Sequence, residues 1–255
     1  MSRRDGEDLL SDSEIERYSR QLLLPGMGEA SQLRLRRATA VVVGCGGLGG
    51  QAALYLAGAG VGRLRLVDPD RVALDNLHRQ VAFRGADLGR PKVVALADAL
   101  FARNPLIEIE PVDLTLGEES VGELLASADM VLECTDDPLS KFTVNDWCAS
   151  RQIPLVVGGA IGFSGQVVVV RPGAPCYRCL FHSPPEGATR TCREAGVMGP
   201  LVGVVGSLQA LEAIKALAGL ADGGRRGRLV DFDGLSGRWR TIAFDRDQGC
   251  PAHSM

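Results

Sequence analysis

The chain has 255 residues, and its 28 basic and 31 acidic side chains give a formal net charge of −3, which excludes a general nucleic-acid binder because such a protein needs a strongly positive surface. Hydrophobic residues make up 45% of the chain, so intrinsic disorder is excluded as well. The longest uncharged stretch, residues 38–62, contains eight glycines and does not match a membrane span, and the charged N-terminus has no apolar signal region, so we expect a cytoplasmic protein.

The first part of the chain is predicted to contain two short helices. Ser13 and Glu16 have the spacing of a capping box, which predicts a first helix that runs through Leu22. A second helix is predicted near residues 30–37. Residues 1–12, which precede the capping signal, are expected to be flexible.

From residue 39 onward, predicted strands and helices alternate along the chain. The strands are predicted at residues 39–43, 63–67, 107–112, 129–133 and 154–157. The helices are predicted at residues 47–59, 91–103, 118–126 and 138–150, with Pro91 in the first turn of the second. This alternation indicates an α/β fold, Rossmann-like and doubly wound, with a mostly parallel sheet and helices on both faces.

The last third of the chain has a different pattern. A strand is predicted at residues 165–170, followed by a loop rich in proline and cysteine at 171–196. A long helix is then indicated by apolar residues at steps of three and four, namely Leu201, Val204, Leu208, Leu211, Ile214 and Ala218. Strands near 228–232 and 239–244 are predicted to join the same sheet as antiparallel additions.

A glycine-rich turn follows the first predicted strand. Gly44, Gly46 and Gly47 belong to a G-x-G-x-x-G segment between a strand and a helix, where backbone N–H groups can approach a phosphate. Asp68 follows the next strand, 24 residues after Gly44, in the position of an acid that binds ribose hydroxyls. The alternative is a glycine turn needed only for packing. The agreement of strand, turn, helix and acid favours a nucleotide.

Charged residues near this turn favour a triphosphate over a dinucleotide. Arg79 and Lys92 can supply the positive charge that a triphosphate needs, in a chain with no P-loop lysine. Asp136 and Asp137 follow another strand at the same expected sheet edge and could hold magnesium. Asp136 could equally be the N-cap of the following helix. A nicotinamide-dependent oxidoreductase remains the alternative, although no acid–base residue with an added substrate domain is evident.

Four residues with short spacings predict a metal site. The pairs are Cys176 with Cys179 and Cys250 with His253, and two such pairs can form a closed tetrahedral zinc site. The alternative is unligated thiols in a mobile tail. Seven cysteines, an odd number in a chain of this length, do not indicate a secreted disulfide framework.

Seven motifs in their order along the chain resemble the ThiF/MoeB/HesA family, the bacterial relatives of ubiquitin-activating enzymes. They are R-Y-S-R-Q (17–21), G-C-G-G-L-G (44–49), D-x-D…N-L-x-R-Q (68–80), R-P-K (90–92), C-T-D (134–136), C-Y-R-C-L (176–180) and G-V-x-G-P-x-x-G-x-x-G-S-L-Q-A-L-E-A-I-K (196–215). The likeness covers about residues 14–253. The resemblance implies an ATP-dependent adenylyltransferase that activates the Gly-Gly carboxylate of a ubiquitin-like sulfur-carrier protein, ThiS- or MoaD-like, as an acyl-adenylate.

The resemblance also implies roles for individual residues. The phosphate turn would be lined by Gly44, Gly46 and Gly47, and the ribose would be held by Asp68. The phosphates would be contacted by Asn76, Arg79 and Lys92, with Gln80 in the same nucleotide-binding set. Magnesium would be organised by Asp136. Arg20 matches the arginine that reaches across a homodimer into the partner's site. Where Asp137 stands, the family usually has asparagine.

The resemblance extends to the cysteines and to the organisation of the chain. The family binds zinc with two C-x-x-C pairs, so His253 as the fourth ligand is a departure. Cys192 matches a cysteine that joins the carrier through sulfur in the thiamin branch. We expect one domain over 1–255, with N-terminal helices at 13–37, a nucleotide-binding core at 39–160 and a carrier-binding and zinc part at 161–255.

Several alternatives stay open at this stage. The chain ends at the predicted zinc site, so sulfur is expected from a separate donor, either a cysteine desulfurase or a rhodanese. A non-catalytic scaffold with the same fold is disfavoured by the intact set of charged residues. An adenylating enzyme acting on a peptide or a tRNA base is a further alternative, and the choice between thiamin and molybdopterin biosynthesis is open.

Overall fold

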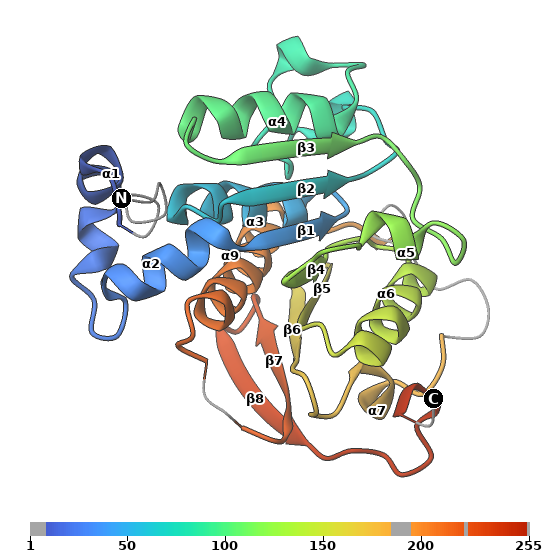
Figure 1. The fold of residues 1–255 in the computed structure, drawn as a ribbon. Helices are drawn as coiled ribbons and strands as arrows, with labels where there is room; N and C mark the ends of the chain where they lie inside the picture. The colour runs from blue at the N-terminus through green and yellow to red at the C-terminus, as the bar shows by residue number, and fades with distance from the viewer. Residues whose placement is uncertain (1–8, 185–194, 222–223, 254–255) are drawn as a thin grey trace.

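The computed structural model describes residues 9–184, 195–221 and 224–253. The expectations for residues 1–8 and for Cys192 fall outside the described residues. Within those residues, eight strands form one continuous sheet (Figure 1). In spatial order they are β3 (Glu108–Val112), β2 (Arg63–Val67), β1 (Thr39–Val43), β4 (Met130–Glu133), β5 (Leu155–Ile161), β6 (Ser164–Val170), β7 (Gly227–Asp233) and β8 (Arg238–Phe244).

The sheet combines a parallel half with an antiparallel half, which confirms the predicted fold class. Strands β3, β2, β1, β4 and β5 run parallel, whereas β6, β7 and β8 are antiparallel additions. The order reverses between β1 and β4, because the chain first adds strands on one side of β1 and then on the other. Such a reversal opens a crevice at the carboxyl ends of the strands.

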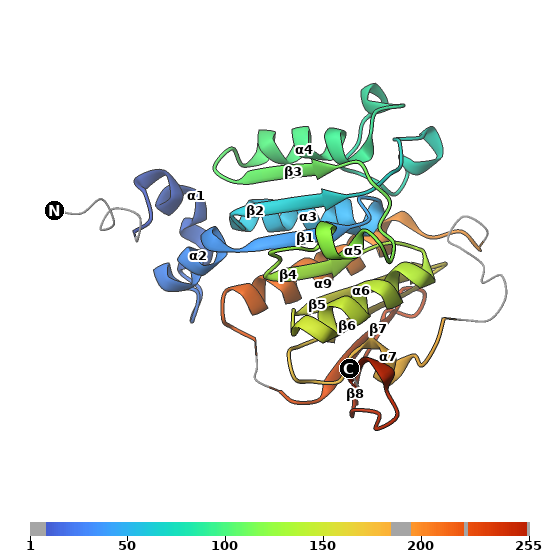
Figure 2. The same cartoon turned by 45° about the vertical axis from the view of Figure 1, so that its right-hand side comes forward.

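Helices cover both faces of the sheet, as Figures 1 and 2 show. The helices are α1 (Asp12–Leu22), α2 (Gly28–Arg37), α3 (Gly47–Ala59), α4 (Lys92–Arg103), α5 (Val121–Leu124), α6 (Pro138–Arg151), α7 (Tyr177–Leu180) and α9 (Gly199–Leu217), with short 3-10 helices η1 (Leu74–Asn76), η2 (Gly85–Asp87) and η3 (Pro251–His253). Helices α3, α4 and α9 lie on one face, and α5 and α6 on the other.

Two hydrophobic cores follow from this layering. In β1, Ala40 and Val42 face the core under α3, α4 and α9, whereas Val41 and Val43 face the core under α5 and α6. All four side chains are buried. Successive strand residues point to opposite faces, so a strand covered on both sides must be apolar throughout. This requirement explains the unbroken apolar run that predicts the strand.

Three predicted details of the elements are wrong. The first helix is capped by Ser11, whose capping box uses Glu14, two residues before the predicted one. The helix predicted at 118–126 forms only one turn, α5. Helix α9 itself is confirmed, but its apolar stripe is only partly buried, since Leu201 is 4% exposed whereas Val204 is 36% and Leu211 52% exposed. Helix α9 is apolar on nearly all sides, so its periodicity cannot select the face that packs.

By length and composition α9 could cross a membrane, and within the described residues it is the one helix that could. Its buried side packs against α3, β5 and β6, where it forms part of the main core. This is the position of a core helix.

Candidate functional site

A cavity of about 260 Å³ opens at the carboxyl ends of β1, β2 and β4, where the strand order reverses. Nine of the residues predicted from the sequence line it together, namely Gly44, Gly46, Gly47, Asp68, Asn76, Arg79, Gln80, Lys92 and Asp136. Apolar side chains such as Val43, Val67, Leu114 and Leu116 complete the wall. The cavity lining therefore combines apolar side chains with charged groups.

The glycine turn is shaped by close backbone approaches. Gly44 has φ +87°, and a Cβ there would lie 2.9 Å from the backbone nitrogen of Thr135. At Gly49, in the first turn of α3, a Cβ would lie 1.8 Å from the carbonyl oxygen of Gly44. Glycine is required at 44 by the left-handed conformation and at 49 by the close approach of the backbone. The turn thus presents its backbone to the cavity.

This packing predicts a contrast between two glycines of α3. Gly49→Ala is expected to lower the free energy of unfolding by about 2 kcal/mol or more, because the new methyl group must displace backbone. Gly58→Ala, on the same helix, meets no atom within 4 Å and is expected to raise that free energy by about 0.5–1 kcal/mol. Urea denaturation of both variants measures the difference. Equal effects would contradict this account of the turn.

Asp68 connects the glycine turn to the next strand. Its carboxylate accepts hydrogen bonds from the backbone N–H of Cys45 at 2.6 Å and from that of Asp70 at 2.8 Å. Burial raises the pKa of Asp68, and the Lys92 ammonium and the two N–H donors oppose that rise. The carboxylate is therefore held in place by the backbone and can still accept a hydrogen bond from a ligand hydroxyl.

Lys92 and Arg79 are the two cations in the cavity lining. Lys92 is the first residue of α4 and only 5% exposed, and its Nζ lies 2.8 Å from Asp70 Oδ2. Arg79 donates to the carbonyl oxygen of Asp75 at 2.9 Å. Gln80 Oε1 is buried without a hydrogen-bond partner among the described residues. A buried amide oxygen with no partner is a group that a ligand can satisfy.

Asp136 and Asp137 have different positions. Asp137 is the N-cap of α6 and accepts from the backbone N–H of Leu139 at 3.2 Å and of Ser140 at 3.0 Å. The alternative that Asp136 caps this helix is therefore wrong. Because asparagine caps as well as aspartate, an asparagine at 137 would serve the same local purpose as this acid. Asp136 is exposed toward the cavity.

Some residues of the cavity lining were not predicted from the sequence, and one predicted residue lies outside the lining. Asp70 and Thr135 line the cavity but received no role, although Asp70 belongs to the quoted D-x-D motif. Arg20 lies on α1, which contacts the residues that follow α4, where Asn104 donates to the Tyr18 hydroxyl at 2.9 Å, and Arg20 is not among the residues that line the cavity. Within one chain, the structure does not bring Arg20 to the site.

The predicted metal ligands meet in a second cluster. The ligand atoms of Cys176, Cys179, Cys250 and His253 all lie within 4.8 Å of one another. The Sγ of Cys176 lies 4.0 Å from that of Cys179 and 3.6 Å from that of Cys250. Tetrahedral zinc with Zn–S bonds of about 2.3 Å requires Sγ–Sγ separations of about 3.8 Å. His253 Nε2 is buried without a partner among the described residues, so the donor set fits the metal.

Helix α6 holds one half of this cluster in place. Asn145 Oδ1 accepts from the backbone N–H of Tyr177 at 2.8 Å, and Arg178 makes a two-pronged ion pair with Asp146 at 2.6 and 2.7 Å. The other half comes from Cys250 and from η3, which lie about 70 residues further along the chain. The cluster therefore joins the segment at α7 to the segment at η3.

The remaining described cysteines are buried in the cores. Burial raises the pKa of Cys45 and Cys134, and raises that of Cys148 to about 12. These thiols stay protonated near neutral pH, which makes them poor nucleophiles. Their position is that of core residues.

The fold and the cavity define a Rossmann-like nucleotide-binding protein. The ThiF family profile matches residues 18–252, so the chain belongs to the ThiF family. It is 44% identical over 244 residues to the sulfur carrier protein ThiS adenylyltransferase of Escherichia coli K12, covering 95% of this chain and 96% of that protein. It is 45% identical over 243 residues to the molybdopterin-synthase adenylyltransferase of Salmonella typhimurium, covering 94% and 97%.

Other relatives are longer or more distant. The adenylyltransferase and sulfurtransferase MOCS3 of Dictyostelium discoideum is 41% identical over 247 residues, which are 96% of this chain, but the chain spans only 58% of that protein. Among solved structures, Escherichia coli MccB with ATP matches with a TM-score of 0.82 at 23% identity, over 94% of this chain and 75% of MccB. This likeness supports the fold alone.

Proposed function

We propose that the protein is an ATP-dependent adenylyltransferase that activates the C-terminal Gly-Gly carboxylate of a ubiquitin-like sulfur-carrier protein. A carboxylate oxygen of the carrier attacks the α-phosphorus of ATP, the bond to the oxygen that bridges the α- and β-phosphates breaks, and pyrophosphate leaves. The products are the acyl-adenylate and pyrophosphate. The observation that carries the proposal is a cavity in which Asp68, Lys92, Arg79 and Asp136 surround one glycine turn.

Each residue has a part in this reaction that follows from its chemistry. Asp68 accepts ribose hydroxyls, and the backbone N–H groups of the glycine turn face the phosphates. Lys92 leaves Asp70, which is 48% exposed at its side chain and can be solvated by water, and turns to the phosphates. Positive charge beside the α-phosphate stabilises the charge that develops there during the attack. The reaction needs positioning and electrostatics, with no covalent nucleophile in the cavity.

Magnesium belongs to the same proposal because of the charge balance in the cavity. Four carboxylates, Asp68, Asp70, Asp136 and Asp137, line it against two cations. A bare triphosphate with about four negative charges would be repelled by such a lining. Asp136 is the residue that would hold magnesium, which when bound neutralises the phosphates.

Zinc is the metal that we propose for the second cluster. Cys176, Cys179, Cys250 and His253 would hold it in a closed four-ligand site. Such a site has no open position for water, so its contribution is to the stability of the fold. None of these residues lines the nucleotide cavity.

We extend the proposal to a homodimer and to a separate sulfur donor. Arg20 could act on a cavity only in the partner copy, since it does not line the cavity of its own chain. The described cysteines are either buried in the cores or members of the metal cluster, so these residues offer no sulfur for transfer. The role of Cys192 in sulfur transfer stays a prediction.

The organisation of the chain belongs to the same proposal. The unbroken sheet supports one domain, with the nucleotide-binding core at 39–160 and the carrier-binding and zinc part at 161–255. A cytoplasmic location agrees with the use of ATP.

Pyrophosphate–ATP exchange tests the proposed function and the pathway together. The purified protein is incubated with ATP, magnesium, labelled pyrophosphate and either a ThiS-like or a MoaD-like carrier. Exchange is expected only with a carrier that ends in Gly-Gly, and a carrier lacking its last glycine is the control. The carrier that supports faster exchange identifies thiamin or molybdopterin biosynthesis. No exchange with any carrier, together with saturable binding of NAD, would favour an oxidoreductase instead.

A further inference from the structure

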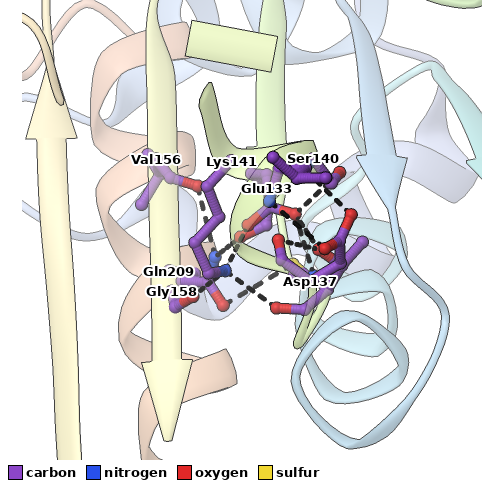
Figure 3. A network of polar contacts seen from close by, with 10 residues as sticks. Glu133, Asp137, Ser140, Lys141, Val156, Gly158 and Gln209 are labelled. Carbon is purple, nitrogen blue, oxygen red and sulfur yellow. Dashed lines mark hydrogen bonds and ion pairs between the residues drawn. The ribbon is translucent and has the colours of Figure 1, made fainter. Parts of the chain in front are cut away.

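A buried ion pair lies directly behind the segment that carries Asp136. Glu133, the last residue of β4, is 0% exposed, and its Oε2 lies 2.5 Å from Lys141 Nζ on α6. Figure 3 shows the two side chains meeting between the ends of β4 and β5. Burying a charged pair is unfavourable unless every donor and acceptor is satisfied. The contacts around this pair therefore indicate what it is arranged to hold.

The Lys141 ammonium uses all three of its protons. Besides Glu133, it donates to the carbonyl oxygens of Thr135 and Gly158, each at 2.8 Å. The backbone pairing between β4 and β5 stops at Glu133 and Val157. Beyond this point the two segments that follow these residues separate, and residues of both line the cavity. Lys141 thus ties the two separating segments together at the point where the backbone ladder can no longer do so.

The Glu133 carboxylate holds the same segment from the other side. Its Oε1 accepts from the backbone N–H of Thr135 at 3.1 Å, from the Thr135 hydroxyl and from the Ser140 hydroxyl at 3.3 Å. Gln209 of α9 donates to the carbonyl oxygens of Glu133 at 2.9 Å and Val156 at 3.2 Å (Figure 3). Residues on both sides of position 136 are therefore fixed, since Asp137 caps α6.

Asp136 itself has no hydrogen bond or ion pair to another residue of the described chain. We propose that Glu133 and Lys141 are positioning residues that hold the 134–137 segment so that Asp136 presents a free carboxylate to the metal–nucleotide complex. The inference rests on the proposed function. It predicts that the pair affects the part of ATP binding that depends on magnesium, whereas adenosine binding through Asp68 and the apolar wall does not depend on it.

The test is the affinity for ATP, measured by calorimetry with magnesium and in EDTA. The variant Glu133→Gln/Lys141→Met removes both charges at once, so that no lone charge is buried. We expect its affinity with magnesium to fall about 10- to 100-fold, the usual effect of losing a residue behind a metal ligand. The affinity in EDTA is expected to change less than about twofold. The single variant Lys141→Arg keeps the positive charge, and its affinity for ATP with magnesium is expected to be close to that of the wild type.

Two further variants keep the test decisive. Lys215→Met is the matched control, because Lys215 also pairs with a buried carboxylate, Glu212 at 2.8 Å, but does not line the cavity; its affinities are expected to equal those of the wild type. Thr135→Val removes one hydroxyl contact to Glu133 and should produce a smaller loss of the same kind if the double variant does not fold.

The possible results separate the inference from the proposed function. Equal weakening with magnesium and in EDTA, or wild-type affinities in both, would overturn the positioning role while the proposed function stands. If the wild-type protein binds ATP no better with magnesium than without, the proposed function fails as well. A magnesium-specific loss in the double variant, absent from Lys215→Met, supports the inference.

Discussion

Lys92→Ala is expected to lower the rate of carrier-dependent pyrophosphate–ATP exchange by about 100- to 1000-fold, the usual effect of removing one preorganised donor beside a reacting centre. Lys92 is buried at the start of α4, where water cannot replace its charge fully. The measurement is the exchange rate at saturating ATP, magnesium and carrier. The Lys92→Ala variant should still fold, because the side chain of Asp70, the ion-pair partner of Lys92, is 48% exposed and can be solvated by water once the ammonium is gone.

The control for this prediction comes from the other lysines of the chain. Only three lysines, Lys92, Lys141 and Lys215, stand among the 28 basic residues. Lys215→Ala removes a lysine that lies outside the cavity lining, so its exchange rate should match that of the wild type. Lys92→Arg keeps a cation with another shape and should fall between the two. An unchanged rate in Lys92→Ala would remove this lysine from the site and would leave Arg79 as the cation there.

Loss of the metal cluster is expected to have the largest effect on stability. Structural zinc contributes apparent binding energies of about 10–16 kcal/mol in small peptides, and all of that energy is available only to a folded site. In Cys250→Ser even a loss of about 3 kcal/mol would lower the melting temperature by about 6–12 °C for a chain of this size. Differential scanning calorimetry, together with the zinc content, measures the effect. The affinity for ATP should stay close to that of the wild type, because no member of the cluster lines the cavity.

Variants of His253 provide the control for the metal prediction. His253→Cys keeps four ligands and should retain one zinc per chain, whereas His253→Ala should lose zinc and show the lower melting temperature. A chelator added to the wild-type protein should reproduce the result of Cys250→Ser. If Cys250→Ser kept both the metal and the melting temperature, Cys250 would not be a ligand, and the close approach of the three sulfur atoms would need another explanation.

The course of the chain and much of the cavity could be predicted because the signals are local. The unbroken apolar run at 39–43, the glycines after it and the acid at 68 each depend on geometry within a few residues, and the structure brings them together at one sheet edge. Residue spacing also indicated the metal cluster, since each pair is only three residues apart. The carboxyl ends of parallel strands lie at one edge of the sheet. The residues that follow β1, β2 and β4 could therefore be predicted to lie close together.

Contacts between distant segments decided the rest. The sequence did not indicate which side of α9 is buried, because the helix is apolar nearly all round and only the sheet selects a face. It could not assign the capping role to Asp137 over Asp136, since both residues cap equally well by chemistry. The pairing of Glu133 with Lys141 depends on where β4 separates from β5 and on Gln209 from α9, 76 residues away from Glu133. Local conformation follows from neighbours in the sequence, but the partners of a buried charge are set by packing between segments that meet only in the folded chain.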